Sequence, residues 1–455
     1  FDDENGSLQI RGGTGLFTGT PPYVWISNQA GNNGVLFGDL NVRAVKDKND
    51  NIISDGRPSL GFTGNMDTYK PAEGSATRSD IAITDPDFKY PSLWKSNIAA
   101  DYKFGDGWVA TVELLYSKDI NAIYHDNIGL YRTEQFVNDG GAGNARPYYN
   151  GYYSDREGNQ KAANHVVMLR NTSKGHSLYT TFQLQKNFVD GILKGFYLNG
   201  SYSFGQSRGV TDGTSSVATS AWKYRAALDG NAEEVGYTAG SFDGRLLLSA
   251  SYTANWSKYA ATSFGLIYQR YRPFRYSYCY NGDANGDSQF SNDLMYIPAN
   301  FDEVKDHLLP GDFDSQEDAW KAMNAFIEQD PYLSKHRGEY AERNGAVAPF
   351  ANQLDLSVSH DIKIYQKNGR SHTLRFSFNI ANFLNLLNRN WGVVQTTVLG
   401  NQQYQFLTIP KGQGPSAANN YTLKYTMAKD LDETFKDNLN DVSRWQMQFG
   451  IKYIF

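Results

Sequence analysis

The sequence predicts an all-β fold, a transmembrane antiparallel β-barrel with long polar loops. Aromatic residues make up 14% of the 455 residues, although the mean hydropathy is only -0.56. No run of about 18 apolar residues is present, which excludes a membrane-spanning helix. Instead, segments of about ten residues alternate between apolar and polar side chains. Such a barrel keeps a low mean hydropathy because only every second residue of a strand faces lipid.

The clearest of these segments is the last one, residues 444–455. Its odd positions are all apolar or aromatic, and five of its six even positions are not. This period of two predicts a membrane-spanning strand with one face toward lipid. We expect membrane insertion and barrel closure to depend on four residues of that face, Phe449, Ile451, Tyr453 and Phe455.

Five earlier stretches alternate in the same way: residues 107–117, 194–205, 246–256, 352–364 and 372–383. They exceed the average strand of soluble proteins, about 5–6 residues, and match the roughly 9–11 residues of a tilted membrane strand. Their polar faces carry Arg, Lys, Asp and Glu, which indicates water on that side. A large soluble sandwich or propeller alternates similarly, so periodicity alone leaves that alternative open.

The lengths of the links between these stretches favour the barrel. Tight links are expected at Gly105–Gly107, Val189–Gly191, Ser257–Tyr259 and Gln366–Arg370. Long polar links are expected at roughly 130–163, 205–244 and 278–348. Outer-membrane barrels alternate short periplasmic turns with long extracellular loops in this manner. We count about 12–14 strands in one partial barrel domain over residues 1–455, with no plug domain visible.

The longest loop contains a predicted helix near residues 315–330. Ser315 is a suitable N-cap, acidic residues fill the first turn, and Pro331 follows the end. One helix face is apolar, and we expect it to pack on the base of its own loop rather than on a partner. Its residues are Ala319, Trp320, Met323, Phe326 and Ile327.

Residues 283–293, DANGDSQFSND, resemble a calcium-binding loop. Asp283, Asn285 and Asp287 stand at positions 1, 3 and 5, and Asp293 could supply a late ligand. Ca²⁺ takes six to eight oxygen ligands, which this spacing curls around one point. The pattern departs from an EF-hand, since position 6 is not Gly and position 12 is not Glu. An ordinary polar turn is the alternative, because the same residue types favour turns.

Other motifs point away from catalysis and nucleic acid. A net charge of -5 gives no basic surface for nucleic acid, and a single Cys excludes multi-Cys metal sites. The seven His are scattered, and no nucleophile or phosphate-loop motif is present. We therefore predict no catalytic residues and no enzyme activity.

Two further stretches have structural explanations. Residues 12–19, GGTGLFTG, could be a phosphate-binding loop or a flexible loop that lets backbones approach closely. The flexible loop is the favoured interpretation. Residues 271–280, YRPFRYSYCY, alternate Arg and Tyr around the lone thiol of Cys279. They could line a ligand path, but an interfacial aromatic girdle is the favoured interpretation.

Several stretches carry a family resemblance. The terminal Phe455 and the alternation before it resemble the C-terminal signal of Gram-negative outer-membrane barrels, and residues 379–392 resemble a strand region of TonB-dependent transporters. Residues 11–29, 280–298 and 336–358 are similar to the Oar-like branch of TonB-dependent receptors of Bacteroidota. This resemblance implies the C-terminal part of a barrel of about 22 strands, whose N-terminal plug and TonB box are not visible here.

The resemblance also implies function and partners. We expect an outer-membrane receptor with extracellular loops that bind an unidentified ligand, followed by TonB-driven rearrangement of the plug. Expected partners are the lipid bilayer, TonB, the plug domain, the barrel-assembly machinery and a surface lipoprotein. The one candidate cofactor, Ca²⁺ in the 283–293 loop, comes from the residues of that loop and not from the resemblance. A passive channel or adhesin of similar form, and a soluble secreted β-rich binding protein, remain the alternatives.

Overall fold

The computed structural model describes residues 6–20, 23–33, 44–47, 51–55, 64–65, 67–68, 80–141, 145–152, 165–213, 215–365, 371–399 and 403–455. Over these ranges the fold is mostly β. Its main feature is an antiparallel sheet of 11 strands. Within the described ranges no helix has the length and apolar character needed to cross a membrane.

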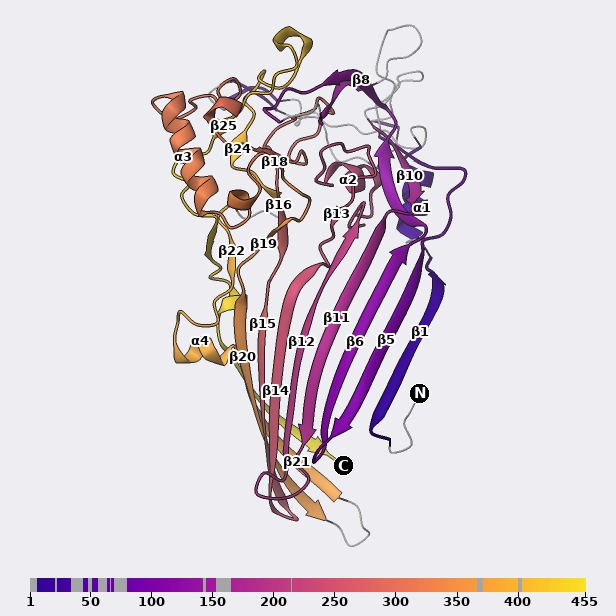
Figure 1. Ribbon diagram of the computed structural model, residues 1–455, viewed down its shortest axis with the longest axis vertical. Coiled ribbons are helices and arrows are strands. Elements are labelled where there is room, and N and C mark those ends of the chain that lie inside the picture. The colour runs from indigo at the N-terminus through magenta and orange to yellow at the C-terminus, as the bar shows by residue number, and fades with distance from the viewer. Residues whose placement is uncertain are drawn as a thin grey trace.

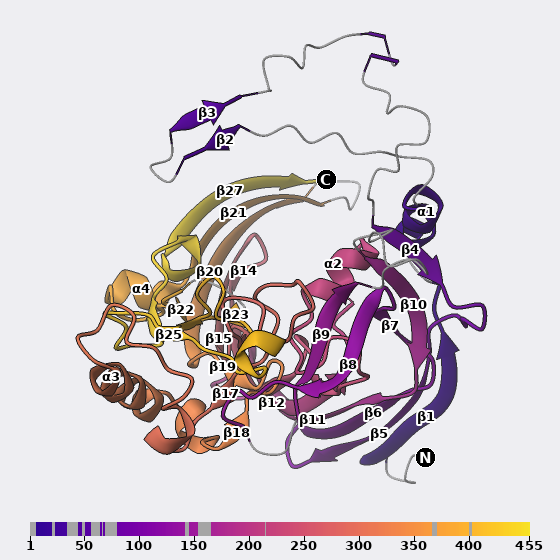
Figure 2. The ribbon, with the colours of Figure 1, turned by 90° about the horizontal axis from the view of Figure 1, so that it is seen from above.

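Ten long strands make up the path of this sheet, in chain order from one edge to the other. They are β1 (Leu8–Thr18), β5 (Ser92–Phe104), β6 (Trp108–Asp119), β11 (Gly175–Asn187), β12 (Phe196–Gly209), β14 (Phe242–Ser257), β15 (Ala260–Tyr271), β20 (Ala351–Tyr365), β21 (Ser371–Ala381) and β27 (Gln446–Ile454). The short strand β13 (Gly236–Tyr237) pairs with β12 beside the path. Figure 1 shows the long strands side by side, and Figure 2 shows them as an arc seen from above.

The structure confirms the strands that alternation predicts. The six stretches lie in β6, β12, β14, β20, β21 and β27, and the ten path strands have 9 to 16 residues. The described tight links join strands at one end of the sheet, and the expected long links carry α2 (Ala218–Lys223), α3 (Gln316–Gln329) and small strands at the other end (Figure 1). Two more long links, between β1 and β5 and between β21 and β27, were not expected. The link at 366–370 lies outside the described residues, and the count of 12–14 strands stays a prediction.

The two faces of the sheet differ in polarity because side chains alternate along every strand. One face carries apolar rows that run across neighbouring strands in register. One such row consists of Phe196, Tyr252, Phe264, Val358, Phe378 and Phe449. We call this surface the apolar face.

The opposite face carries polar side chains that bond across the strands. Arg375 on β21 pairs with Asp361 on β20 through two hydrogen bonds of 2.6 and 2.8 Å. Gln269 donates to Gln353 at 2.9 Å, in the same way between β15 and β20. These cross-strand pairs satisfy the polar groups and fix the register.

A body of loops, here called the loop body, lies beyond the end of the sheet that carries the long links (Figure 1). Its strands are β4 (Ile81–Thr84), β7 (Ala122–Asn127), β8 (Leu130–Phe136), β9 (Pro147–Tyr152), β10 (Val166–Thr172), β16 (Arg275–Tyr278), β17 (Tyr296–Ile297), β18 (Glu339–Tyr340), β19 (Ala346–Val347), β22 (Gln395–Thr397), β23 (Gln403–Tyr404), β24 (Leu407–Thr408), β25 (Thr426–Met427) and β26 (Phe435–Asp437). Its helices are α1 (Tyr23–Gly31), α2 (Ala218–Lys223) and α3 (Gln316–Gln329), with 3-10 turns at Phe301–Glu303, Leu333–Lys335, Ala417–Asn419 and Asp441–Ser443. The short helix α4 (Phe383–Leu387) lies beside β20 (Figure 1). A further pair, β2 (Val45–Lys46) and β3 (Ile52–Ser54), stands apart from both (Figure 2).

The loop body has its own apolar core. It is built around Tyr278, Tyr280, Phe326, Tyr404 and Phe406, all at most 1% exposed. The rings of Phe326 and Phe406 lie 4.8 Å apart. This core holds the long links together as a folded unit, so that their backbones are not left exposed to solvent.

Helix α3 forms as the sequence predicts. Ser315 caps it by accepting a hydrogen bond from the Asp318 N–H at 3.1 Å. Its apolar residues, among them Met323 and Phe326, are buried in the core of the loop body. The stripe therefore packs within the loop body, partly on its own loop as expected and partly on residues of the link between β21 and β27, such as Phe406.

Two structural expectations are wrong. Residues 12–19 belong mostly to β1 rather than to a flexible loop, since β1 pairs with β5 over its whole length. Gly12 still allows the backbones of β1 and β5 to approach closely, because a Cβ at this position would lie 2.7 Å from the Asn97 carbonyl oxygen. Residues 276–280 form no girdle, since Tyr276, Tyr278 and Tyr280 are buried in the loop body.

Candidate functional site

The apolar face is the largest candidate surface of the described chain. Phe449, Ile451 and Tyr453 of β27 are 66%, 62% and 56% exposed, and Phe455 just beyond them is 91% exposed. The first three pair with Phe378, Phe376 and Leu374 of β21. Exposed apolar side chains continue on this face through β14, β12, β11 and β6 to Val112 and Leu114. The structure thus brings the residues that the sequence singles out for insertion onto one continuous surface.

The edges of the sheet are formed by β1 and β27. Within the described residues each of these strands pairs with one neighbour, β5 or β21. Their outer backbone groups are therefore available to further strands.

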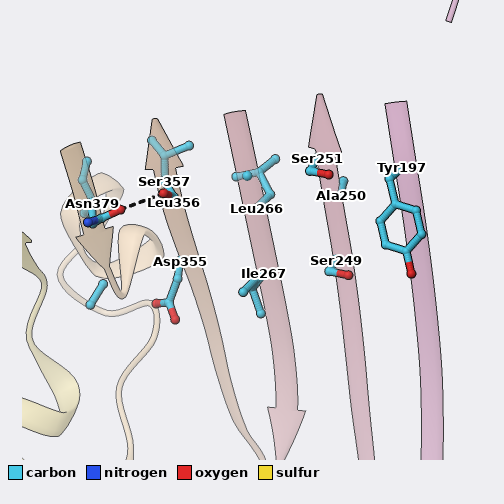
Figure 3. A pocket seen from close by; sticks show the side chains of 13 residues that line it. Tyr197, Ser249, Ala250, Ser251, Leu266, Ile267, Asp355, Leu356, Ser357 and Asn379 are labelled. Carbon is cyan, nitrogen blue, oxygen red and sulfur yellow. Dashed lines mark hydrogen bonds between the residues drawn. The ribbon is translucent and has the colours of Figure 1, made fainter. Parts of the chain in front are cut away.

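A hollow of about 450 Å³ opens on the sheet across β12, β14, β15, β20 and β21 (Figure 3). Tyr197, Ser251, Ser357 and Asn379 line it, and Ser357 donates to Asn379 Oδ1 at 2.7 Å. Asp355 is the one charged residue of the lining that the structure describes, and its Oδ1 accepts from the Asn382 N–H. The hollow thus combines a few polar side chains with a mostly apolar lining, and its described residues include no pair of acid and base groups.

The turn at residues 283–293 gathers the predicted calcium ligands. The carboxylate of Asp283 accepts from the N–H groups of Gly286 at 2.6 Å and Ser288 at 2.8 Å. Asn285 Oδ1 accepts from the Asp287 N–H at 2.9 Å. Asn285, Asp287 and Asp293 are each 1% exposed.

Asp293 differs from the other acids because it has a cationic partner. The guanidinium of the fully buried Arg146 bonds Asp293 at 3.2 Å and Asp139 at 2.9 Å. The Ala284 N–H donates to the other Asp293 oxygen at 2.8 Å. Asp293 thus anchors the turn to Arg146, which also holds Asp139.

The charge of this turn is only partly compensated. Burial raises the pKa of Asp287 well above its ordinary value, and repulsion by Asp293 and Asp283 raises it further. Burial also raises the pKa of Asp293 to about 7, against the attraction of Arg146. The structure describes no group of three or more acidic, His or Cys side chains arranged to hold a metal ion. The amide Oδ1 of Asn292 is buried there without a hydrogen-bond partner, and calcium at this turn stays a prediction.

A second cavity was not foreseen from the sequence. It measures about 830 Å³ and lies in the loop body, with Arg225, Arg275 and Arg343 in its lining. Arg275 belongs to the stretch 271–280 that the sequence marks as a ligand path or girdle. Arg225 and Arg343 carry no local signal, because the fold brings them together from distant loops.

Comparison of the chain with protein-family models and with curated proteins gives no match.

Proposed function

We propose that this chain forms much of an outer-membrane β-barrel and serves TonB-dependent transport of an extracellular ligand. The observation that carries the proposal is the apolar face. Long antiparallel strands expose in-register apolar rows on one side and hydrogen-bonded polar pairs on the other. Soluble monomers rarely expose contiguous apolar patches of more than a few hundred Å². Lipid against the apolar face explains the exposed apolar rows, and water against the opposite face explains the polar pairs.

The edges of the sheet support closure into a barrel. A bilayer offers no hydrogen-bond partners, so an unpaired strand edge is costly within it. This cost is removed if further strands pair with β1 and with β27 and so close the sheet between these two edges. The plug domain of a complete receptor would then pack against the polar face, including the hollow of Figure 3.

The loop body fits the side of the membrane that meets the ligand. Outer-membrane barrels place long loops outside the cell and short turns in the periplasm. In this arrangement the loop body binds the ligand, and TonB acts on the plug from the periplasm. The barrel-assembly machinery would insert the chain, and a surface lipoprotein could cover the loop body.

Two measurements test the proposal. Membranes of producing cells are washed with alkaline carbonate and then extracted with detergent, and electrophoresis with and without boiling follows. We expect the chain in the washed membranes, with a mobility that heating changes. Release of the chain without detergent would overturn the membrane assignment. Ligand uptake that persists at an unchanged rate after TonB is deleted would instead favour a passive channel.

A further inference from the structure

The cavity of about 830 Å³ in the loop body is lined by more positive than negative groups. Its lining contains Arg225, Arg275 and Arg343 but only one carboxylate, Asp212, so the three positive charges minus one negative charge leave +2. Arg275 also bonds Asp243, which lies outside the lining. Counting this pair leaves +1, before two acids outside the lining that act on Arg225, Glu234 and Asp229, are considered.

Arg225 and Arg343 meet at a single backbone oxygen. Arg225 Nη1 donates to the Val210 carbonyl at 3.3 Å, and Arg343 Nη1 donates to the same oxygen. Their other described hydrogen bonds also go to carbonyls. Arg225 donates to Gly230 and Ala232, and Arg343 donates to Gly209, Gly236 and Tyr237. Carbonyl dipoles solvate a cation but do not neutralise it, so two like charges stay close together at low exposure.

One guanidinium donor of Arg225 has no hydrogen-bond partner, and nearby charges affect the pKa of this side chain. Arg225 is 5% exposed, and its Nε has no hydrogen-bond partner in the structure. Burial and repulsion by Arg343 lower the pKa of Arg225 to about 10, although Glu234 and Asp229 oppose this. Glu234 and Asp229 thus offset part of the positive charge, and Arg225 Nε remains the guanidinium donor that the protein leaves without a partner.

The rest of the lining suits an organic ligand rather than a bare ion. Ser220, Ser277 and Asn344 provide neutral hydrogen-bond groups, and Tyr224 and Phe274 provide apolar surface. A volume of about 830 Å³ lies within the range of small-molecule sites, roughly 300–1,000 Å³.

We propose that this cavity binds an organic ligand through a carboxylate placed beside Arg225, Arg275 and Arg343. An oxyanion supplies the charge that the carbonyls cannot, and it forms charge-assisted hydrogen bonds with guanidinium groups. The inference rests on the proposed function in treating this ligand as the extracellular one. It specifies the ligand class as carboxylate-bearing, with a peptide C-terminus and a uronic acid as two sources.

The test compares matched probe pairs that differ only in charge. The purified chain is titrated calorimetrically with acetyl-trialanine and its C-terminal amide, and with glucuronate and glucuronamide. We expect the charged member of at least one pair to bind about tenfold more tightly than its neutral partner. The pair that shows the preference identifies the source of the carboxylate. Absence of binding by both charged probes up to about 10 mM, or equal affinity within both pairs, overturns the inference.

Variants locate the binding. Arg225→Gln should remove the charge preference and Arg225→Lys should keep most of it, with folding checked by thermal melting. Because Arg225 also holds loop carbonyls, a second pair is built at Ala239, an exposed residue of the rim. Ala239→Asp should weaken the charged probe about tenfold, whereas Ala239→Asn should leave it unchanged. Equal affinities in both Ala239 variants would place the binding elsewhere and overturn the assignment to this cavity.

This experiment separates the inference from the proposed function. Calorimetry requires neither TonB nor a membrane. TonB-independent uptake together with charge-selective binding would overturn only the proposed function. TonB-dependent uptake without charge selectivity would overturn only the inference.

Discussion

The sheet and the loop body use the same aromatic residue types in opposite ways. On β27 Phe449 is 66% exposed, whereas in the loop body Phe326 is 1% exposed and packs against Phe406. The sheet satisfies its polar groups through regular ladders and cross-strand pairs such as Arg375 with Asp361. The loop body instead uses buried charges such as Arg146. The loop body therefore buries its aromatic rings as a water-soluble domain does, whereas the sheet leaves an apolar face exposed.

The largest expected effect tests this difference with one substitution in each region. Phe326→Ala opens a cavity in the loop body and should cost about 3–5 kcal/mol of its unfolding free energy. Phe378→Ala on the apolar face, where Phe378 is 38% exposed, should cost much less because little packing is lost. The rate of limited proteolysis in the loop body measures its stability in each of the two variants. Equal rates of cleavage in the two variants would contradict the distinction.

The next prediction concerns neighbours on opposite faces of β27. Phe449 lies on the apolar face, and Gln448 lies on the polar face. Phe449→Arg places a charge against lipid, which costs roughly 2–4 kcal/mol near the middle of a membrane, whereas Gln448→Arg faces water. We expect the first variant to reduce the heat-modifiable form in the membrane and the second to retain it. Equal loss in both variants would argue against a lipid-facing role for Phe449.

Sequence patterns predicted the sheet well because period two is a local property. Each strand contains its own alternation, and the in-register rows follow once neighbouring strands pair. Helix α3 was also predictable, since Ser315 and the apolar stripe are local signals. The prediction of a loop at residues 12–19 failed because glycines weaken the alternation in β1 without preventing its pairing with β5.

The loop body could not be predicted in the same way. Tyr276, Tyr278 and Tyr280 resemble a girdle in sequence, and only contacts with distant residues such as Tyr404 place them in a core. The arginine cavity has the same origin, because Val210 and Arg225 come from the link between β12 and β14, whereas Arg343 comes from the link between β15 and β20. By contrast, Asp283, Asn285 and Asp287 were foreseen as one turn because their spacing is local.

The acid sensitivity of the loop body should depend on His125. Its side chain is 5% exposed and lies edge-on to Trp25 at 6.0 Å, and burial with repulsion by Arg225 lowers its pKa to about 4. The unfolded chain, with a His pKa of about 6.5, binds more protons than the folded chain between these values. Stability therefore falls as the pH drops from about 6.5 to 4, by up to about 3 kcal/mol. His125→Gln should flatten this part of the pH profile of proteolysis, and an unchanged slope would contradict the assignment.

The smallest expected effect concerns the turn at residues 283–293, where Asp287 has no cationic partner at hydrogen-bond distance among the described residues. Asp287→Asn keeps the shape and removes a buried charge, so in EDTA it should raise the midpoint of thermal unfolding. If the sequence prediction of calcium is right, Ca²⁺ raises the midpoint of the wild type and not of the variant. At a concentration ten times the Kd, the gain for the wild type is about 1.4 kcal/mol. Ser291→Asn, at a neighbouring position that supplies no carboxylate, should respond to Ca²⁺ like the wild type. A midpoint unaffected by Ca²⁺ in every chain would leave these residues as an ordinary polar turn, held by Arg146 through Asp293.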